Sequence, residues 1–181
     1  MLTFVLEMSM SAAQQVECDV LVIGSGASGM SAAITAVSRG LKVIVAEKAP
    51  YYGGTTSRSG GWLWVPNTHL AKAMGHHESP DQALTYIKDQ AGEHFDEART
   101  RAFLNHGPAA IDFFMSKTAV QFDMPLTFPD YHAEAPGAAQ GGRSMVTRPY
   151  DARELGPLLK TLGPVLPELT VFGPVSYTHL R

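Results

Sequence analysis

Three glycines and one acid have the types and spacing needed to bind a dinucleotide. Gly24, Gly26 and Gly29 follow the G-x-G-x-x-G pattern, and Glu47 comes 18 residues after Gly29. In this pattern the first glycine permits a tight turn, the second lets a pyrophosphate approach the backbone, and the third allows close packing of helix on strand. An acid at this distance can accept hydrogen bonds from both hydroxyls of a ribose. The spacing therefore predicts a dinucleotide site.

The residues around the glycines predict the elements that would position them. Val20–Ile23 is a short apolar run, typical of a strand buried on both faces of a parallel sheet. A helical stretch follows and ends at Gly40, and Lys42–Ala46 reads as a second strand that Glu47 closes. The helix would direct its N-terminal N–H groups and its positive dipole end at the phosphates. The sequence thus predicts a strand–helix–strand unit around the turn.

The stretch Gly53–Asn67 favours FAD over a nicotinamide cofactor. It holds four glycines and four hydroxyl residues directly after the strand that ends in the acid. Backbone N–H groups and short hydroxyls at this place can surround a second side of the pyrophosphate and the sugar chain of FAD. The predicted cofactor-binding residues are Gly24, Ser25, Gly26, Ala27, Ser28, Gly29, Glu47, Lys48, Gly53, Gly54, Thr55, Thr56, Ser57, Ser59, Gly60 and Gly61.

The rest of the chain predicts helices and one long loop. Ser79 followed by a proline reads as a helix start, and Asp96 reads as the cap of a further helix. The Gly107-Pro108 pair predicts a break in that helix. Phe128–Leu155 is too rich in Gly, Pro and polar residues for a packed element, so we expect a long loop that is either functional or disordered. Tyr131 in this loop is a candidate for ligand binding or proton transfer.

Composition excludes several classes of function. The 181 residues carry a net charge of −3 with 45% hydrophobic and 17% charged residues, which predicts a globular protein of about one domain. We expect no nucleic-acid surface, because such a surface needs clustered basic residues. We expect no metal site, because metal-ligand spacings of His and Cys are missing. No apolar stretch approaches the ~20 residues of a membrane span. The single cysteine, Cys18, favours a cytoplasmic protein, and we expect residues 1–16 to be a disordered extension.

Several segments together resemble a known flavoprotein superfamily. They are DVLVIGSGASG, the strand ending in Glu47-Lys48, GGTTSRSGGWLWVPN, FPDY with its loop, and the run from DARELGPLL to LPELTVFG. They resemble the succinate dehydrogenase and fumarate reductase superfamily, and most of all its 3-ketosteroid 1-dehydrogenases. The resemblance runs from about Glu17 to Gly173. It implies an α/β fold: a Rossmann-like, GR2-type FAD-binding domain with a parallel sheet, flanking helices and non-covalently bound FAD.

The resemblance also implies a reaction. The family removes hydrogens from carbons 1 and 2 of a 3-keto steroid, with a tyrosine base taking the proton and FAD taking the hydride. A second tyrosine, in the FPDY motif, supports the base and maps onto Tyr131. An external electron acceptor would reoxidise the flavin. Two alternatives stay open: a fumarate reductase-like flavoprotein acting on another unsaturated acid or ketone, and a non-catalytic fragment.

The family is longer than this chain, which implies a fragment. Residues 17–174 would be the N-terminal part of the FAD-binding domain, without the substrate domain and the C-terminal half. The base and the groups that polarise the ketone lie in those later regions, so we expect the chain to be inactive alone. Residues 175–181 resemble translated adaptor sequence and are expected to be a non-native tail.

Overall fold

The computed structural model describes residues 2–5, 15–125 and 127–169, and it divides the chain into two compact units. The first unit holds residues 1–60 and 151–181, and the second holds residues 61–150. The strands within 61–150 pair with each other in a sheet of their own. The predicted bounds of the FAD-binding part, 17–174, stay a prediction. The tail 175–181 lies outside the described residues.

The elements follow in a fixed order along the chain. The first unit contains β1 (Leu2–Val5), β2 (Val20–Ile23), α1 (Ala27–Ser38), β3 (Val43–Ala46), η1 (Thr56–Arg58), η3 (Ala152–Thr161) and η4 (Pro167–Leu169). The second contains β4 (Trp62–Trp64), α2 (His69–Ala73), α3 (Pro80–Ala91), η2 (Gly92–His94), α4 (Glu97–Lys117), β5 (Phe122–Asp123) and β6 (Ser144–Thr147).

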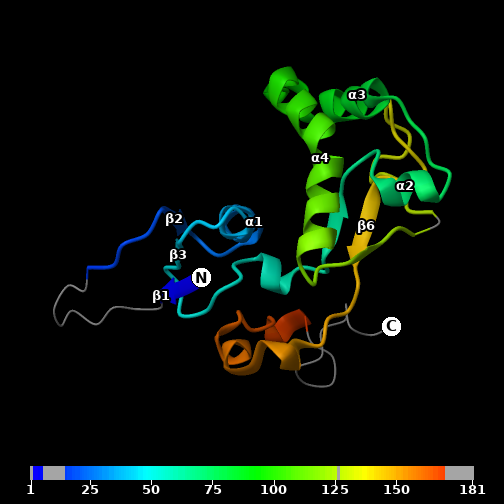
Figure 1. Ribbon diagram of the computed structural model, residues 1–181. Coiled ribbons are helices and arrows are strands. Elements are labelled where there is room, and N and C mark those ends of the chain that lie inside the picture. Colours follow the sequence, from blue (N-terminus) through cyan, green and yellow to red (C-terminus); the bar gives the residue numbers. More distant parts are fainter. Residues whose placement is uncertain (1, 6–14, 126, 170–181) are drawn as a thin grey trace. The chain divides into compact units, whose positions relative to one another are not determined.

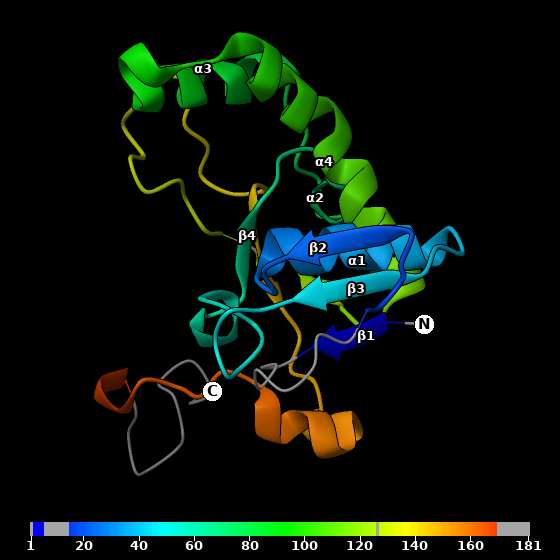
Figure 2. The same cartoon turned by 90° about the vertical axis from the view of Figure 1, so that its left-hand side faces the viewer.

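A parallel sheet with one helix on it forms the centre of the first unit. The strand order is β1-β3-β2, and Val20 lies opposite Val43 in the register. Figure 2 shows α1 against β2 and β3. Val22, Val43 and Val45 form the core there with Ala33 of α1, which is fully buried. The predicted strand–helix–strand unit is confirmed.

Two expectations for this sheet need correction. The predicted burial of β2 on both faces is wrong, because Leu21 and Ile23 are 57% and 76% exposed. Side chains alternate between the faces of a strand, and α1 covers only the face of Val22. The structure also places Leu2–Val5 in a strand parallel to β3, where we expect a disordered extension. An apolar run of this kind can add a strand to an open sheet edge.

The second unit combines an antiparallel sheet with three helices (Figure 1). The strand order is β4-β6-β5, so β6 is central and its residues 144–146 are buried. This strand lies inside Phe128–Leu155, where the sequence predicts no packed element. The prediction is wrong here because the four residues of β6 pair with β4 or β5, and Val146 pairs with both. This pairing outweighs the composition of the surrounding loop.

The helices of the second unit begin as predicted, and one of them continues further than predicted. Ser79 and Asp96 accept hydrogen bonds from backbone N–H groups of the first turns of α3 and α4. The predicted break at Gly107-Pro108 is wrong, since α4 runs through both residues to Lys117. Gly107 has no Cβ to clash with the proline ring, and an added Cβ would lie 2.9 Å from Val65. The helix is therefore packed closely at the proline rather than broken.

The described residues contain neither a membrane-spanning helix nor a cluster of metal ligands. No described helix is both long and apolar enough to cross a membrane. No group of three or more His, Cys, Asp or Glu side chains in the described parts could hold a metal ion.

Candidate functional site

The turn between β2 and α1 brings the three glycines together for different reasons. Gly24 has φ +92°, a conformation that L side chains rarely adopt, and its N–H donates to the carbonyl of Ala46 at 2.7 Å. An added Cβ on Gly29 would lie 2.0 Å from the Gly24 carbonyl oxygen. An added Cβ on Gly26 would meet nothing closer than the Thr56 hydroxyl, at 3.9 Å. The backbone conformation therefore requires glycine at 24 and packing requires it at 29, whereas Gly26 leaves open space.

Ser25 connects the glycine turn to the acid and to the second glycine loop. Its side chain is buried, and its hydroxyl donates to Glu47 at 2.5 Å and accepts from the N–H of Gly53 at 2.9 Å. The backbone N–H of Ser25 also donates to Glu47, at 2.9 Å. One small side chain thus joins three segments that the sequence analysis assigns to the cofactor.

Glu47 is ionised at neutral pH because several donors surround its carboxylate. The hydroxyl of Ser25, the N–H of Ala49 and the N–H of Ser25 lower the pKa of Glu47 to about 2. An ionised carboxylate offers about four acceptor positions. Ser25 donates two hydrogen bonds to it and Ala49 donates one. Binding of the two ribose hydroxyls to this carboxylate stays a prediction.

The loop after Tyr52 closes over the N-terminus of α1. An added Cβ on Gly54 would lie 3.3 Å from the Cα of Gly26, and the Thr56 hydroxyl accepts from the N–H of Ala27 at 3.0 Å. Residues from the far end of the unit hold this loop from behind: Tyr52 exchanges backbone hydrogen bonds with Thr161 and Gly163. No local pattern predicts that support, since more than 100 residues separate the two segments.

The predicted cofactor residues do not all meet in this loop. Lys48, Ser28 and Ser59 are exposed side chains of the first unit. Gly61 belongs to the second unit, where its φ is +73° and an added Cβ would lie 2.1 Å from the Thr147 hydroxyl. Packing beside β6 therefore accounts for this glycine.

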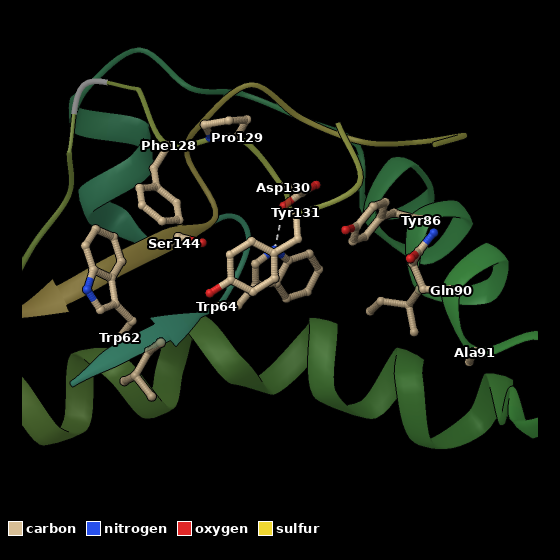
Figure 3. A pocket seen from close by; sticks show the side chains of 12 residues that line it. Trp62, Trp64, Tyr86, Gln90, Ala91, Phe128, Pro129, Asp130, Tyr131 and Ser144 are labelled. Carbon is tan, nitrogen blue, oxygen red and sulfur yellow. Dashed lines mark hydrogen bonds between the residues drawn. The ribbon is translucent and has the colours of Figure 1, made fainter. Parts of the chain in front are cut away.

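The second unit contains an aromatic pocket of about 510 Å³ (Figure 3). Its lining residues are Trp62, Leu63, Trp64, Tyr86, Ile87, Gln90, Ala91, Phe128, Pro129, Asp130, Tyr131 and Ser144. The rings of Trp62 and Phe128 are stacked with centroids 4.2 Å apart. Tyr131 is 89% exposed, and no described residue hydrogen-bonds its hydroxyl. A volume of this size is that of pockets for small organic ligands, which hold about 300–1,000 Å³.

Charged residues contact the aromatic side chains of this pocket. They are not among the site residues predicted from the sequence. Asp130 accepts a hydrogen bond from the indole N–H of Trp64 at 2.7 Å and pairs with Arg143 at 2.6 Å. Arg143 also pairs with Glu78 at 2.6 Å. The FPDY motif contains Asp130, but nothing in the sequence shows which cationic side chain forms an ion pair with it.

Comparison with known protein families matches residues 19–177 to the family described as FAD binding domain. The chain belongs to this family. The match includes the glycine turn, Glu47, the second glycine loop and the aromatic pocket.

Two similar proteins are named as dehydrogenases. The chain is 44% identical, over 87% of its length, to 4-oxocyclohex-2-ene-1-carboxylate 5-dehydrogenase of Sinomonas cyclohexanicum. It is 43% identical, over 82% of its length, to 3-oxosteroid 1-dehydrogenase of Mycobacterium tuberculosis. The chain spans about a quarter of each relative, 26%.

A solved structure shares the fold. The chain is similar to 3-ketosteroid delta1-dehydrogenase of Sterolibacterium denitrificans, solved in complex with 1,4-androstadiene-3,17-dione. The TM-score is 0.79 at 37% identity, with 89% of this chain and 28% of that chain covered. The predicted Rossmann-like FAD-binding fold is thereby confirmed.

The residues around the glycine turn fit FAD. Gly26 and Gly54 face each other without side chains, so the backbone of both loops is accessible to a pyrophosphate. Gly26, the N-cap residue of α1, has no side chain to cap the helix, and Thr56 binds the N–H of Ala27. The other N–H groups of such a first turn have no intrahelical acceptor. Glu47 adds an ionised carboxylate, which is an acceptor for ribose hydroxyls.

Proposed function

We propose that this chain is the FAD-binding part of a dehydrogenase that acts on the ring of a 3-keto steroid. The observation that carries the proposal is the aromatic pocket with Tyr131 at its surface, in a chain that belongs to the FAD binding domain family. The names of its relatives, a 3-oxosteroid dehydrogenase and a ring-ketone dehydrogenase, support this reaction class.

The chemistry of the pocket favours a steroid over a small acid. No Lys or Arg is among the residues that line it, and its Asp130 is already engaged by Trp64 and Arg143. Aromatic rings bury a flat apolar ligand, but they offer no counter-charge to a carboxylate. The second candidate substrate is a single-ring keto acid, which the name of the Sinomonas relative favours.

Each group then has a distinct role. FAD, when bound, accepts a hydride from the carbon β to the ketone. The glycine turn, Ser25 and Glu47 would hold its adenosine and pyrophosphate. The proton from the α carbon passes to a base, and Tyr131 would donate a hydrogen bond that stabilises this base as a phenolate. Such help is needed because a free tyrosine has a pKa near 10.

Two further parts of the proposal concern the cell. The reduced flavin needs an external electron acceptor to complete a turnover. We place the protein in the cytoplasm, since Cys18 is the single cysteine of the sequence and forms no internal disulfide.

The test is a chimera of the Sterolibacterium denitrificans enzyme whose matching N-terminal segment is replaced by residues 17–174 of this chain. The purified chimera is assayed for bound flavin, and then with 4-androstene-3,17-dione or 4-oxocyclohexanecarboxylate and an artificial electron acceptor. We expect bound flavin and turnover of the steroid. A flavin-loaded chimera that oxidises only the keto acid would replace the steroid by the second candidate, and one that oxidises neither would refute the proposal.

Within the chimera, Tyr131→Phe tests the proposed role of its hydroxyl. We expect kcat to fall by about 10²-fold or more with little change in KM or bound flavin, as for an interaction made in the transition state. Tyr150→Phe, at another exposed tyrosine of the second unit, is the matched control and should leave kcat unchanged. Equal kcat values for the two variants would remove Tyr131 from the mechanism.

A further inference from the structure

Arg143 is the most enclosed charged side chain of the second unit. It is 1% exposed, and its guanidinium directs hydrogen bonds in three directions. Nε and Nη2 donate to Glu78, with the shortest distance 2.6 Å, and Nη1 donates to Asp130 at 2.6 Å. Nη2 also donates to the carbonyl of Gly137 at 2.8 Å. The guanidinium thus connects Glu78, which precedes α3, to Asp130 and Gly137 in the loop that carries Tyr131.

The same guanidinium lies against two rings of the aromatic pocket. Its Cζ is 5.5 Å from the ring centroid of Trp64 and 5.6 Å from that of Tyr86. At such distances a cation is attracted to the ring faces. Arg143 therefore supports the rings that line the pocket from β4 and from α3.

Asp130, which directly precedes Tyr131, connects Arg143 to the loop. Both of its carboxylate oxygens are engaged: one accepts from the indole of Trp64, and the other from Arg143 and from the N–H of Ala139 at 3.0 Å. The N–H of Asp130 in turn donates to the carbonyl of Ala139 at 3.0 Å. The loop is fixed on both sides of Tyr131, although the tyrosine side chain itself is exposed.

We propose that Arg143 is a positioning residue, which fixes the place of Tyr131 through Asp130 and fixes the pocket rings through Trp64. The proposal rests on the proposed function only in giving Tyr131 a catalytic purpose. Lysine cannot replace the arginine, because an ammonium lacks the planar fork that binds two carboxylates and a carbonyl at once.

The experiment compares Arg143→Lys with Arg148→Lys in the 181-residue chain. Arg148 is the matched control, since it also pairs with an aspartate but in an exposed position. Hydrogen exchange is followed by peptide, and Tyr131 is observed by fluorine NMR after labelling with 3-fluorotyrosine, its resonance assigned with Tyr131→Phe. We expect Arg143→Lys to speed exchange at least tenfold in peptides covering 130–139, to leave α4 unchanged, and to shift or broaden the Tyr131 resonance. Arg148→Lys should do neither.

A merely structural role would give another result. Exchange would then accelerate throughout the second unit, α4 included, while the Tyr131 resonance of the folded protein stayed in place, and this outcome would overturn the inference. If Arg143→Lys does not fold, Trp64→Phe is the second variant, because it removes the indole N–H bonded to Asp130 and keeps an aromatic ring at this position. An unshifted Tyr131 resonance in a folded Trp64→Phe chain would also overturn it.

The catalytic consequence is measured in the chimera. Arg143→Lys should lower kcat at least tenfold with bound flavin unchanged. Inactivity of the unsubstituted chimera would refute the proposed function alone, because exchange and fluorine NMR judge the positioning role without any turnover.

Discussion

The two units build their sites from opposite materials. In the first unit, the groups around the glycine turn are small, and Ser25 reaches both Glu47 and the backbone of Gly53. In the second unit, the groups are large and charged, and Arg143 meets two carboxylates and two aromatic rings out of contact with solvent. The first site exposes backbone to a polar ligand. The second encloses its charges and presents rings and one exposed tyrosine.

This difference shows where each site is vulnerable. A site made of backbone and small side chains fails when an atom is added, because the ligand needs the space that the added atom would fill. A site made of buried charges fails when an atom is removed, because an unpaired charge is left behind. The following predictions test this contrast, beginning with the largest effect.

Arg143→Met should destabilise the protein by about 3–5 kcal/mol, because Asp130 and Glu78 would lose their buried counter-charge. Arg148→Met is the control: its ion pair with Asp123 is about half exposed, and its loss should cost less than about 1 kcal/mol. Urea denaturation followed by far-UV circular dichroism measures both. Similar losses in the two variants would contradict the contrast between the buried and the exposed pair.

Gly29→Ala and Gly26→Ala should separate packing from cofactor binding. The added methyl at position 29 would collide with the Gly24 carbonyl and should cost about 1–3 kcal/mol of stability. At position 26 it meets open space and a normal backbone conformation, so stability should change by less than about 0.5 kcal/mol.

The affinity for FAD should follow the opposite order, with Gly26→Ala weakening binding more than Gly29→Ala. Titration with FAD, followed by its fluorescence, should show at least tenfold weaker binding for Gly26→Ala than for the unsubstituted chain. FAD binding by Gly26→Ala that equals that of the unsubstituted chain would place the pyrophosphate elsewhere.

Glu47→Gln should reduce stability by about 1 kcal/mol at pH 7, a value kept small by solvent screening. The pKa of Glu47 falls from 4.5 to about 2 on folding, so the ionised acid stabilises the fold above pH 4.5. This contribution is lost as the pH falls towards 2, where variant and parent should converge. Urea midpoints at pH 7 and pH 2.5 measure it, with the exposed Glu93→Gln as control. A stability difference between variant and parent that grows as the pH falls would contradict a lowered pKa of Glu47.

Tyr131→Phe should have the smallest effect on stability, within about 0.5 kcal/mol, because the side chain is exposed and its hydroxyl has no partner among the described residues. Thermal melting of the 181-residue chain measures it. A loss above 1 kcal/mol would mean that the hydroxyl serves the fold and not a reaction.

The first unit could be predicted from sequence because its signals are local. The turn, the helix after it, Glu47 and the second glycine loop lie within 40 residues, and the backbone explains the glycines at 24 and 29. Pairing with β1 and the exposed face at Leu21 and Ile23 could not be predicted, since both depend on which elements cover the sheet.

The second unit was less predictable because its decisive contacts are distant in sequence. Helix caps at Ser79 and Asp96 are local and were predicted correctly. The path of α4 through Pro108 depends on close packing against Val65, and the partner of Arg143 at Glu78 is 65 residues away. Tyr131 stays a prediction from its motif, supported by its place at the pocket.

The strand β4 has a spectroscopic consequence. It carries both tryptophans of the sequence, Trp62 and Trp64, and both line the aromatic pocket. Intrinsic fluorescence excited at the indole band therefore comes entirely from this pocket, while the glycine turn is silent. Steroid binding to the unlabelled protein could be followed by quenching or by a wavelength shift of the tryptophan emission. The variant Trp62→Phe would assign the signal to a single ring.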